Sequence, residues 1–149
     1  MEIKVYTTLP QEAVSIRKTV FCEEQGFEEE FDSVDAEAVH LLMLEQGEPV
    51  GTCRFFWDAD RNAYMIGRIA VLKPYRGQAR GSALLQAAER QIQERGGTQA
   101  HLHAQTQAAA FYSKNGYEAY GEIEYEQGCP HVWMRKRLNA QAEEGQEKR

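Results

Sequence analysis

The residues with the clearest chemical potential lie between Arg76 and Ser82, where two arginines alternate with small side chains. A short apolar strand ending at Val71 precedes them, and apolar residues at helical spacing follow, up to Ile92. The first N–H groups of a helix have no intrahelical partner and carry the positive end of its dipole. We therefore expect a phosphate-binding loop made of Arg76, Gly77, Gln78, Ala79, Arg80, Gly81 and Ser82.

Two common classes of phosphate site do not fit this loop. It has neither the Gly-x-x-x-x-Gly-Lys-Ser/Thr run of nucleoside triphosphatases nor the Gly-x-Gly-x-x-Gly spacing of dinucleotide-binding folds. The remaining alternative is an ordinary strand-to-helix turn whose basic residues face solvent.

Length and composition limit the number of domains, the class of partner and the cell compartment to be expected. With 149 residues and 42% apolar content, we expect one domain over residues 1–138 and a polar, frayed tail over 139–149. The net charge of −6 argues against a nucleic-acid partner and suits a cationic one. Three widely spaced cysteines indicate neither a disulfide framework nor a metal knuckle. With no signal peptide and no apolar run of membrane length, we expect a cytoplasmic protein.

The expected elements form the order strand, helix, three strands, helix, strand, helix, two strands. Thr8 and Gln11 match a capping box that starts the first helix, and Gly128 with Pro130 is expected to turn between the last two strands. The other expected bounds are strands over 2–6, 39–44, 50–56, up to 71, 99–104, 117–124 and 131–138, and helices ending near 95–97 and spanning 108–115.

An acidic segment runs from Cys22 to Asp35 and includes Phe27, Phe31 and Val34. Its seven acids make a poor helix, and its apolar side chains indicate a folded loop. It is either a solvated acidic surface or one lip of a cleft that receives a cationic amine.

The phosphate loop resembles the Arg/Gln-x-x-Gly-x-Gly/Ala signature of the GNAT family of N-acetyltransferases, with Arg76 first, Gly81 last and Ala79 in place of the middle glycine. The segment from Gln105 to Tyr117 is similar to the family's Asn-x-x-Ala-x-x-Phe-Tyr-x-Lys-x-Gly-Phe. The resemblance implies an α+β, three-layer fold: a mixed, mostly antiparallel sheet of six to seven strands, splayed at the cofactor strand and flanked by helices.

Further residues resemble the ElaA/YjcF-like branch of the family. They are Arg17-x-x-Val-Phe-x-x-Glu-Gln, His40, Ala104-Gln105 and Glu126-Gln-Gly-Cys-Pro-His131. The resemblance does not supply the acceptor of this branch.

The resemblance implies acetyl-coenzyme A as the cofactor, with its pyrophosphate on the loop. An amide from Ile69, Ala70 or Val71, freed by a bulge, would contact the thioester oxygen, and this edge would pair with pantetheine. Gln105 stands at the family's asparagine. Tyr112 stands at the tyrosine near the cofactor sulfur and would protonate the leaving thiolate, unless it is only a core aromatic.

The proton acceptor stays open among Glu23, Glu24, Glu126 and His131, which are expected in loops beside the cleft, and Glu126 and His131 are preferred. His131 is equally explained by a hydrogen bond that fixes its turn. We expect His101 and His103 to be half-buried sheet residues and no metal to bind. Cys129 as an acyl-accepting nucleophile is the least favoured route.

The sequence therefore predicts an acetyl-coenzyme A dependent N-acetyltransferase. It would act by direct transfer to a primary amine of a small molecule or protein, as a monomer or homodimer, without a nucleic-acid or membrane partner. One alternative is a non-catalytic acyl-coenzyme A sensor. Another is an enzyme like the acyl-homoserine-lactone synthases, because Arg17, Asp32 and Asp35 are similar to that group.

Overall fold

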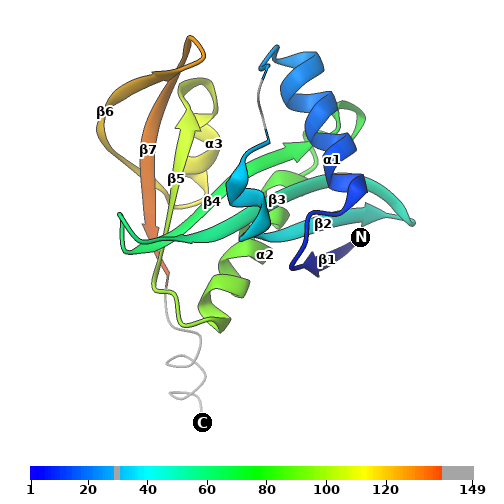
Figure 1. Cartoon of the computed structure of the whole chain (residues 1–149), viewed down its shortest axis with the longest axis horizontal. Helices are drawn as coiled ribbons and strands as arrows, with labels where there is room; N and C mark the ends of the chain where they lie inside the picture. The colour runs from blue at the N-terminus through cyan, green and yellow to red at the C-terminus, as the bar shows by residue number, and fades with distance from the viewer. Residues whose placement is uncertain (29–30, 139–149) are drawn as a thin grey trace. The chain divides into compact units, whose positions relative to one another are not determined.

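The computed structural model describes residues 1–28 and 31–138, and the tail expected over 139–149 lies outside them. Seven strands, three α-helices and short helical turns follow one another in the expected order (Figure 1). The strands are β1 Glu2–Tyr6, β2 Val39–Glu45, β3 Glu48–Asp58, β4 Ala63–Val71, β5 Gln99–Gln105, β6 Glu118–Glu126 and β7 Cys129–Arg137. The α-helices are α1 Gln11–Arg17, α2 Arg80–Glu94 and α3 Ala109–Lys114, and the remaining helical turns are η1 Lys18–Glu24, η2 Ser33–Ala36, η3 Lys73–Tyr75 and η4 Thr106–Ala108.

The strands form one mixed sheet in the order β1-β2-β3-β4-β5-β7-β6. The pairs β1–β2, β2–β3, β5–β7 and β6–β7 are antiparallel. The pair β4–β5 is parallel and joins Tyr64 to Ala100 and Met65 to His101, at the start of each strand. The predicted fold class, a mostly antiparallel sheet with helices, is confirmed.

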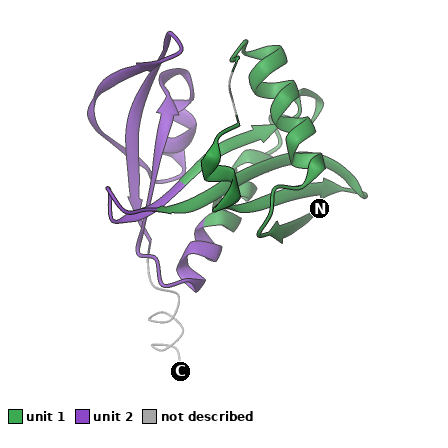
Figure 2. Ribbon diagram, in the orientation of Figure 1, with its two compact units in different colours: residues 1–57, 66–88 green, residues 58–65, 89–149 purple. Residues whose placement is uncertain are grey.

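The chain divides into two compact units, each of which is described by itself (Figure 2). Unit 1 contains residues 1–57 and 66–88, and unit 2 contains residues 58–65 and the chain from 89 onward. A single domain over 1–138 stays a prediction.

Unit 1 has its apolar core between α1 and the sheet. Ala13 and Ile16 of α1 and Val20 of η1 pack with Leu42 and Ala70, which buries the inward face of this helical segment. On β3, successive side chains alternate between opposite faces of the sheet. The buried Cys53 thiol lies 3.9 Å from the Leu84 carbonyl of α2, and burial raises the pKa of Cys53 to about 12.

Unit 2 is organised by the alternation of β5. Ala100, Leu102 and Ala104 are buried on one face of the strand, while His101, His103 and Gln105 share the other. Across the antiparallel pairing these three face Arg135, Trp133 and His131 of β7. One face of unit 2 therefore carries an aromatic and charged surface instead of an apolar one.

Two local predictions are wrong. No capping box starts α1: Pro10 is the N-cap without a side-chain bond, and its carbonyl accepts from Ala13 and Val14. The turn between β6 and β7 is Gln127-Gly128, with φ values of 50° and 78°, and Pro130 lies inside β7. Two adjacent residues of positive φ match the twist of a two-residue hairpin, so β6 and β7 extend further toward each other than expected.

The described residues include no helix long and apolar enough to cross a membrane.

Candidate active site

The expected phosphate loop leads directly into α2, which begins at Arg80. Gly77 has φ +82° and Ala79 has φ +64°, so both lie in the left-handed region. Glycine adopts this region freely, whereas alanine pays about 1 kcal/mol or more for it. Ala79 therefore holds a left-handed backbone conformation at a cost in stability.

Both loop arginines are already engaged inside unit 1. Arg76 donates from Nε to the Val71 carbonyl at 2.7 Å and from a terminal nitrogen to Glu24 at 2.7 Å. Arg80 donates from Nε to Glu45 at 2.9 Å and from Nη1 to the side-chain oxygen of Gln78 at 2.6 Å. An anion at this loop would compete with Glu24 for Arg76, whose side chain is 41% exposed.

The strand that was expected to offer an amide to a thioester contains an irregularity. Arg68, within β4, has φ +52°, and such a residue inside a strand is typical of a bulge. Ile69, Ala70 and Val71 follow it directly. A backbone irregularity thus lies one residue before these amides, while the bulge and the contact of an amide with a thioester stay predictions.

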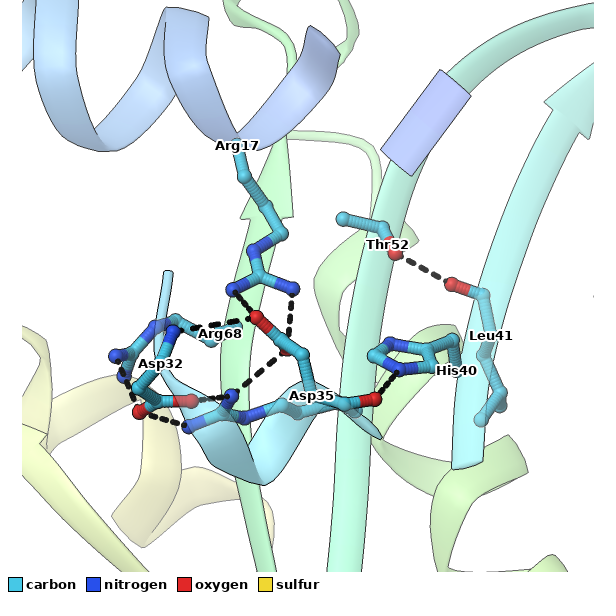
Figure 3. A network of polar contacts seen from close by, with 8 residues as sticks. Arg17, Asp32, Asp35, His40, Leu41, Thr52 and Arg68 are labelled. Atoms are coloured by element: carbon cyan, nitrogen blue, oxygen red, sulfur yellow. Dashed lines mark hydrogen bonds and ion pairs between the residues drawn. The ribbon is translucent and has the colours of Figure 1, made fainter. Parts of the chain in front are cut away.

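A buried ion-pair network in unit 1 joins α1, η2 and β3 (Figure 3). Arg17 donates to both oxygens of Asp35 at 2.9 and 3.1 Å, and Arg54 donates to Asp35 at 2.8 Å and Asp32 at 2.7 Å. Burial alone would raise the pKa of Asp35, but hydrogen bonds and charges from Arg17 and Arg54 outweigh it and lower this pKa to about 2. His40 bonds the Asp35 carbonyl at 2.9 Å, and burial lowers the pKa of His40.

The network explains residues that the sequence marked for another reason. Arg17 is only 1% exposed, and the Asp35 carboxylate compensates its buried charge. Asp32 and Asp35 anchor the acidic segment to β3 through Arg54.

In unit 2, Gln105 ends β5 and its side-chain oxygen accepts from Gln107 at 2.7 Å. Tyr112 lies on α3, edge-on to Phe111 with ring centroids 5.0 Å apart and to Tyr117 at 6.1 Å. This packing fits a core aromatic, and it also fixes the ring from which a hydroxyl can act.

The two preferred proton acceptors lie in strands and not in loops. Glu126 is the last residue of β6, and His131 is in β7, where it bonds the Cys129 carbonyl from Nδ1 at 2.9 Å. The local bond supports the structural explanation of His131. Glu126 accepts from His103 Nδ1 at 2.7 Å, and the His103 and His131 rings lie 4.9 Å apart.

The expected site residues thus fall into two sets. Unit 1 holds the phosphate loop and the residues Ile69–Val71, while unit 2 holds Gln105, Tyr112, Glu126 and His131. Within unit 2, Glu126 and His131 meet around His103. No group of three or more potential metal ligands is arranged to hold a metal ion among the residues that the structure describes.

Comparisons with known proteins identify the family of the chain. Residues 5–138 match the model of the acetyltransferase (GNAT) domain. The chain belongs to the GNAT acetyltransferase family. Within the family it is similar to the uncharacterized N-acetyltransferase YjcF of Bacillus subtilis, with 35% identity covering 85% of this chain and 91% of YjcF.

Two solved GNAT-fold structures are also similar. A candidate N-acetyltransferase from Lactobacillus plantarum has 31% identity and a TM-score of 0.83, covering 93% of this chain and 98% of that one. Escherichia coli ElaA has 25% identity and a TM-score of 0.79, covering 91% and 98%. The resemblance to the ElaA/YjcF-like branch is confirmed.

Sequence reasoning placed His103 correctly in the sheet but missed its partners. The side chain is 13% exposed, as expected of a half-buried sheet residue. Its contacts with Glu126 and Glu124 depend on the register of β5, β7 and β6, which a single sequence does not reveal. The alternation of His101 and His103 with apolar residues is the one signal in the sequence that places both histidines on the same face of a strand.

Proposed function

We propose that this GNAT protein is a cytoplasmic N-acetyltransferase that transfers the acetyl group of acetyl-coenzyme A directly to a primary amine of a small molecule or protein. The observation that carries the proposal is the loop before α2, where Arg76 and Arg80 flank the left-handed residues Gly77 and Ala79. This arrangement suits a pyrophosphate, and the family match supplies the cofactor class.

The reaction needs three groups besides the cofactor. The neutral amine attacks the thioester carbonyl, whose oxygen gains charge and would be held by an amide of Ile69, Ala70 or Val71. The C–S bond breaks, and the thiolate would take a proton from Tyr112. Before the attack, the ammonium form of the acceptor must lose a proton, for which Glu126 and His131 are the candidates.

Binding of the cofactor is tested by calorimetry and thermal unfolding. Acetyl-coenzyme A should raise the melting temperature by mass action, whereas adenosine should not. Arg76→Glu should abolish the shift, and Arg90→Glu, at an exposed position of α2, should retain it. The absence of binding heat at millimolar acetyl-coenzyme A would refute the cofactor assignment.

Turnover separates an enzyme from a sensor. With an accepted amine, Tyr112→Phe should reduce thiol release by about a hundredfold to ten-thousandfold while cofactor affinity stays unchanged. Tyr125→Phe is the matched control, because this ring is 71% exposed. Full activity of Tyr112→Phe across the pH range would make Tyr112 a packing residue.

A screen of amines as acceptors, followed by thiol release from acetyl-coenzyme A, distinguishes two other functions. A sensor would bind acetyl-coenzyme A and release no thiol above background with any amine. An enzyme like the acyl-homoserine-lactone synthases is favoured by one observation, that Arg17, Asp32 and Asp35 belong to one network. The buried ion pairs give these residues a structural role without that activity, so we retain direct acetylation of an amine.

A further inference from the structure

A stacked column of planar side chains crosses the polar face of unit 2. The His103 ring lies 4.3 Å from Trp133 and 4.9 Å from His131, and the Arg61 guanidinium lies 3.4 Å above the Trp133 ring. Two glutamates of β6 meet the edge of the His103 ring. Glu126 is 2.7 Å from Nδ1, and Glu124 is 3.5 Å from Nε2.

The contacts decide where the imidazole carries its proton. A carboxylate only accepts, so the short contact with Glu126 places a proton on Nδ1. In the neutral ring, Nε2 then has a lone pair that faces the carboxylate of Glu124. Nε2 is buried and has no hydrogen-bond partner within residues 1–28 and 31–138.

A second proton would remove this mismatch. The imidazolium donates from both nitrogens and would have a carboxylate at each end. The neutral ring leaves one buried acceptor unpaired, which is unfavourable. The geometry therefore gives each ring nitrogen of His103 a nearby carboxylate, at 2.7 Å from Nδ1 and 3.5 Å from Nε2.

We propose that His103 is the proton acceptor of the acetyl transfer, with Glu126 fixing its tautomer and Glu124 conducting the proton to Nε2. The inference rests on the proposed function and completes it. Glu124 suits the role of exchanging the proton with solvent, because its side chain is 59% exposed whereas Nε2 of His103 is buried.

The proton balance is complete. One N–H bond of the ammonium breaks, and the proton passes to Glu124 and then to Nε2. The amine attacks, the C–S bond breaks, and the thiolate takes the proton of Tyr112. The next amine proton, lost as the amide forms, restores Tyr112, and the imidazolium returns its proton to solvent through Glu124.

His101 provides a matched control on the same strand face. Its Nδ1 lies 2.6 Å from the Tyr120 hydroxyl and its Nε2 lies 3.0 Å from the Gln99 side-chain oxygen, so both nitrogens have neutral partners. Burial lowers the pKa of His101, and Arg135 and Arg61 reinforce the shift, which favours its neutral form. Among the described residues, the charged and titratable groups near the column and His101 are Asp58, Arg61, Glu124, Glu126, His131 and Arg135.

The first test is the pH profile of kcat/KM with an accepted amine. His103→Gln should lose about a hundredfold or more at neutral pH and recover as rising pH deprotonates the amine in solution. Glu124→Gln, at an exposed position, should lose rate in the same direction, and His101→Gln should keep the wild-type profile. Melting temperatures verify that each variant is folded. Wild-type rates in both His103→Gln and Glu124→Gln would overturn the proposal.

The second test needs no cofactor and therefore separates the two proposals. Nitrogen-15 NMR of the imidazoles should show His103 as the Nδ1–H tautomer in the wild type and a mixture in Glu126→Gln. An Nε2–H tautomer in the wild type would overturn the role of His103. Absence of thiol release from the wild type, together with the Nδ1–H tautomer, would refute the acetyl transfer and leave the geometry of His103 intact.

Discussion

The two units each contain a cluster of charged side chains around one central group, and the clusters differ in completeness. In unit 1 both oxygens of the buried Asp35 accept hydrogen bonds from arginines. In unit 2 the described residues give the central His103 a hydrogen bond on one nitrogen only, and its two glutamates are more than half exposed. A buried cluster with matched charges maintains the fold, whereas the open cluster keeps its two carboxylates accessible to solvent.

The largest expected effect is the loss of the centre of the unit 1 network. Asp35→Asn removes the buried carboxylate that accepts hydrogen bonds from both Arg17 and Arg54, so the free energy of unfolding should fall by about 3–5 kcal/mol. Denaturation in urea measures the change. Asp60→Asn, at an exposed position, should change stability by less than about 0.5 kcal/mol. A similar small effect at Asp35 would mean that its ion pairs contribute nothing, and the contrast between the clusters would disappear.

The pH dependence of stability should come from the same carboxylate. The pKa of Asp35 is lowered from 3.8 to about 2 in the folded protein, so its contribution is present above pH 4 and is lost as the pH falls from about 4 to about 2. The loss should be about 2 kcal/mol. Urea unfolding of the wild type and Asp35→Asn at several pH values measures it. Equal acid sensitivity of the two proteins would contradict the assignment to Asp35.

A smaller effect is expected from the backbone of the phosphate loop. Ala79→Gly relieves the left-handed alanine and should raise the free energy of unfolding by about 0.5–1 kcal/mol, with acetyl-coenzyme A bound equally or more tightly. Ala83→Gly, within α2, should instead lose about 1 kcal/mol. Destabilisation by both changes would show that Ala79 is not strained.

The smallest effect concerns the exposed ion pair between Glu24 and Arg76. Glu24→Gln removes a competitor for the anion, so pyrophosphate and acetyl-coenzyme A should bind up to about fivefold more tightly, since exposed pairs contribute at most about 1 kcal/mol. Calorimetry measures both ligands, with the exposed neighbour Glu23→Gln as control. Weaker binding in Glu24→Gln would mean that Glu24 orients Arg76 toward the ligand and does not compete with it.

The sequence was sufficient for the order of elements, because the strands and helices are punctuated by glycine, proline and changes of hydrophobic period. It failed where backbone conformation decided the outcome. Gln127 adopts a positive φ, which glutamine rarely does, so its residue type does not predict the turn. Pro10 begins α1 through its backbone carbonyl, which leaves no side-chain signal in the sequence. The π-helical continuation of α1 over Lys18–Glu24 also has no signal in the periodicity.

For the candidate site, local motifs were recognisable and long-range contacts were not. Arg76–Ser82 and Gln105–Tyr117 are continuous segments, so their spacing is visible in one sequence. Arg54 and Asp35, or His103 and Glu126, are about twenty residues apart and meet only through strand register or loop placement. A single sequence carries no direct signal for such pairs, so it does not select one proton acceptor.

The buried thiol of Cys53 has a practical consequence for kinetics. The raised pKa of Cys53 and its position beside Leu84 prevent reaction with thiol reagents as long as β3 and the start of α2 stay packed together. Cys22 and Cys129 are only partly buried, so they should be labelled first. The rate at which Cys53 is labelled then measures how often β3 and the start of α2 separate.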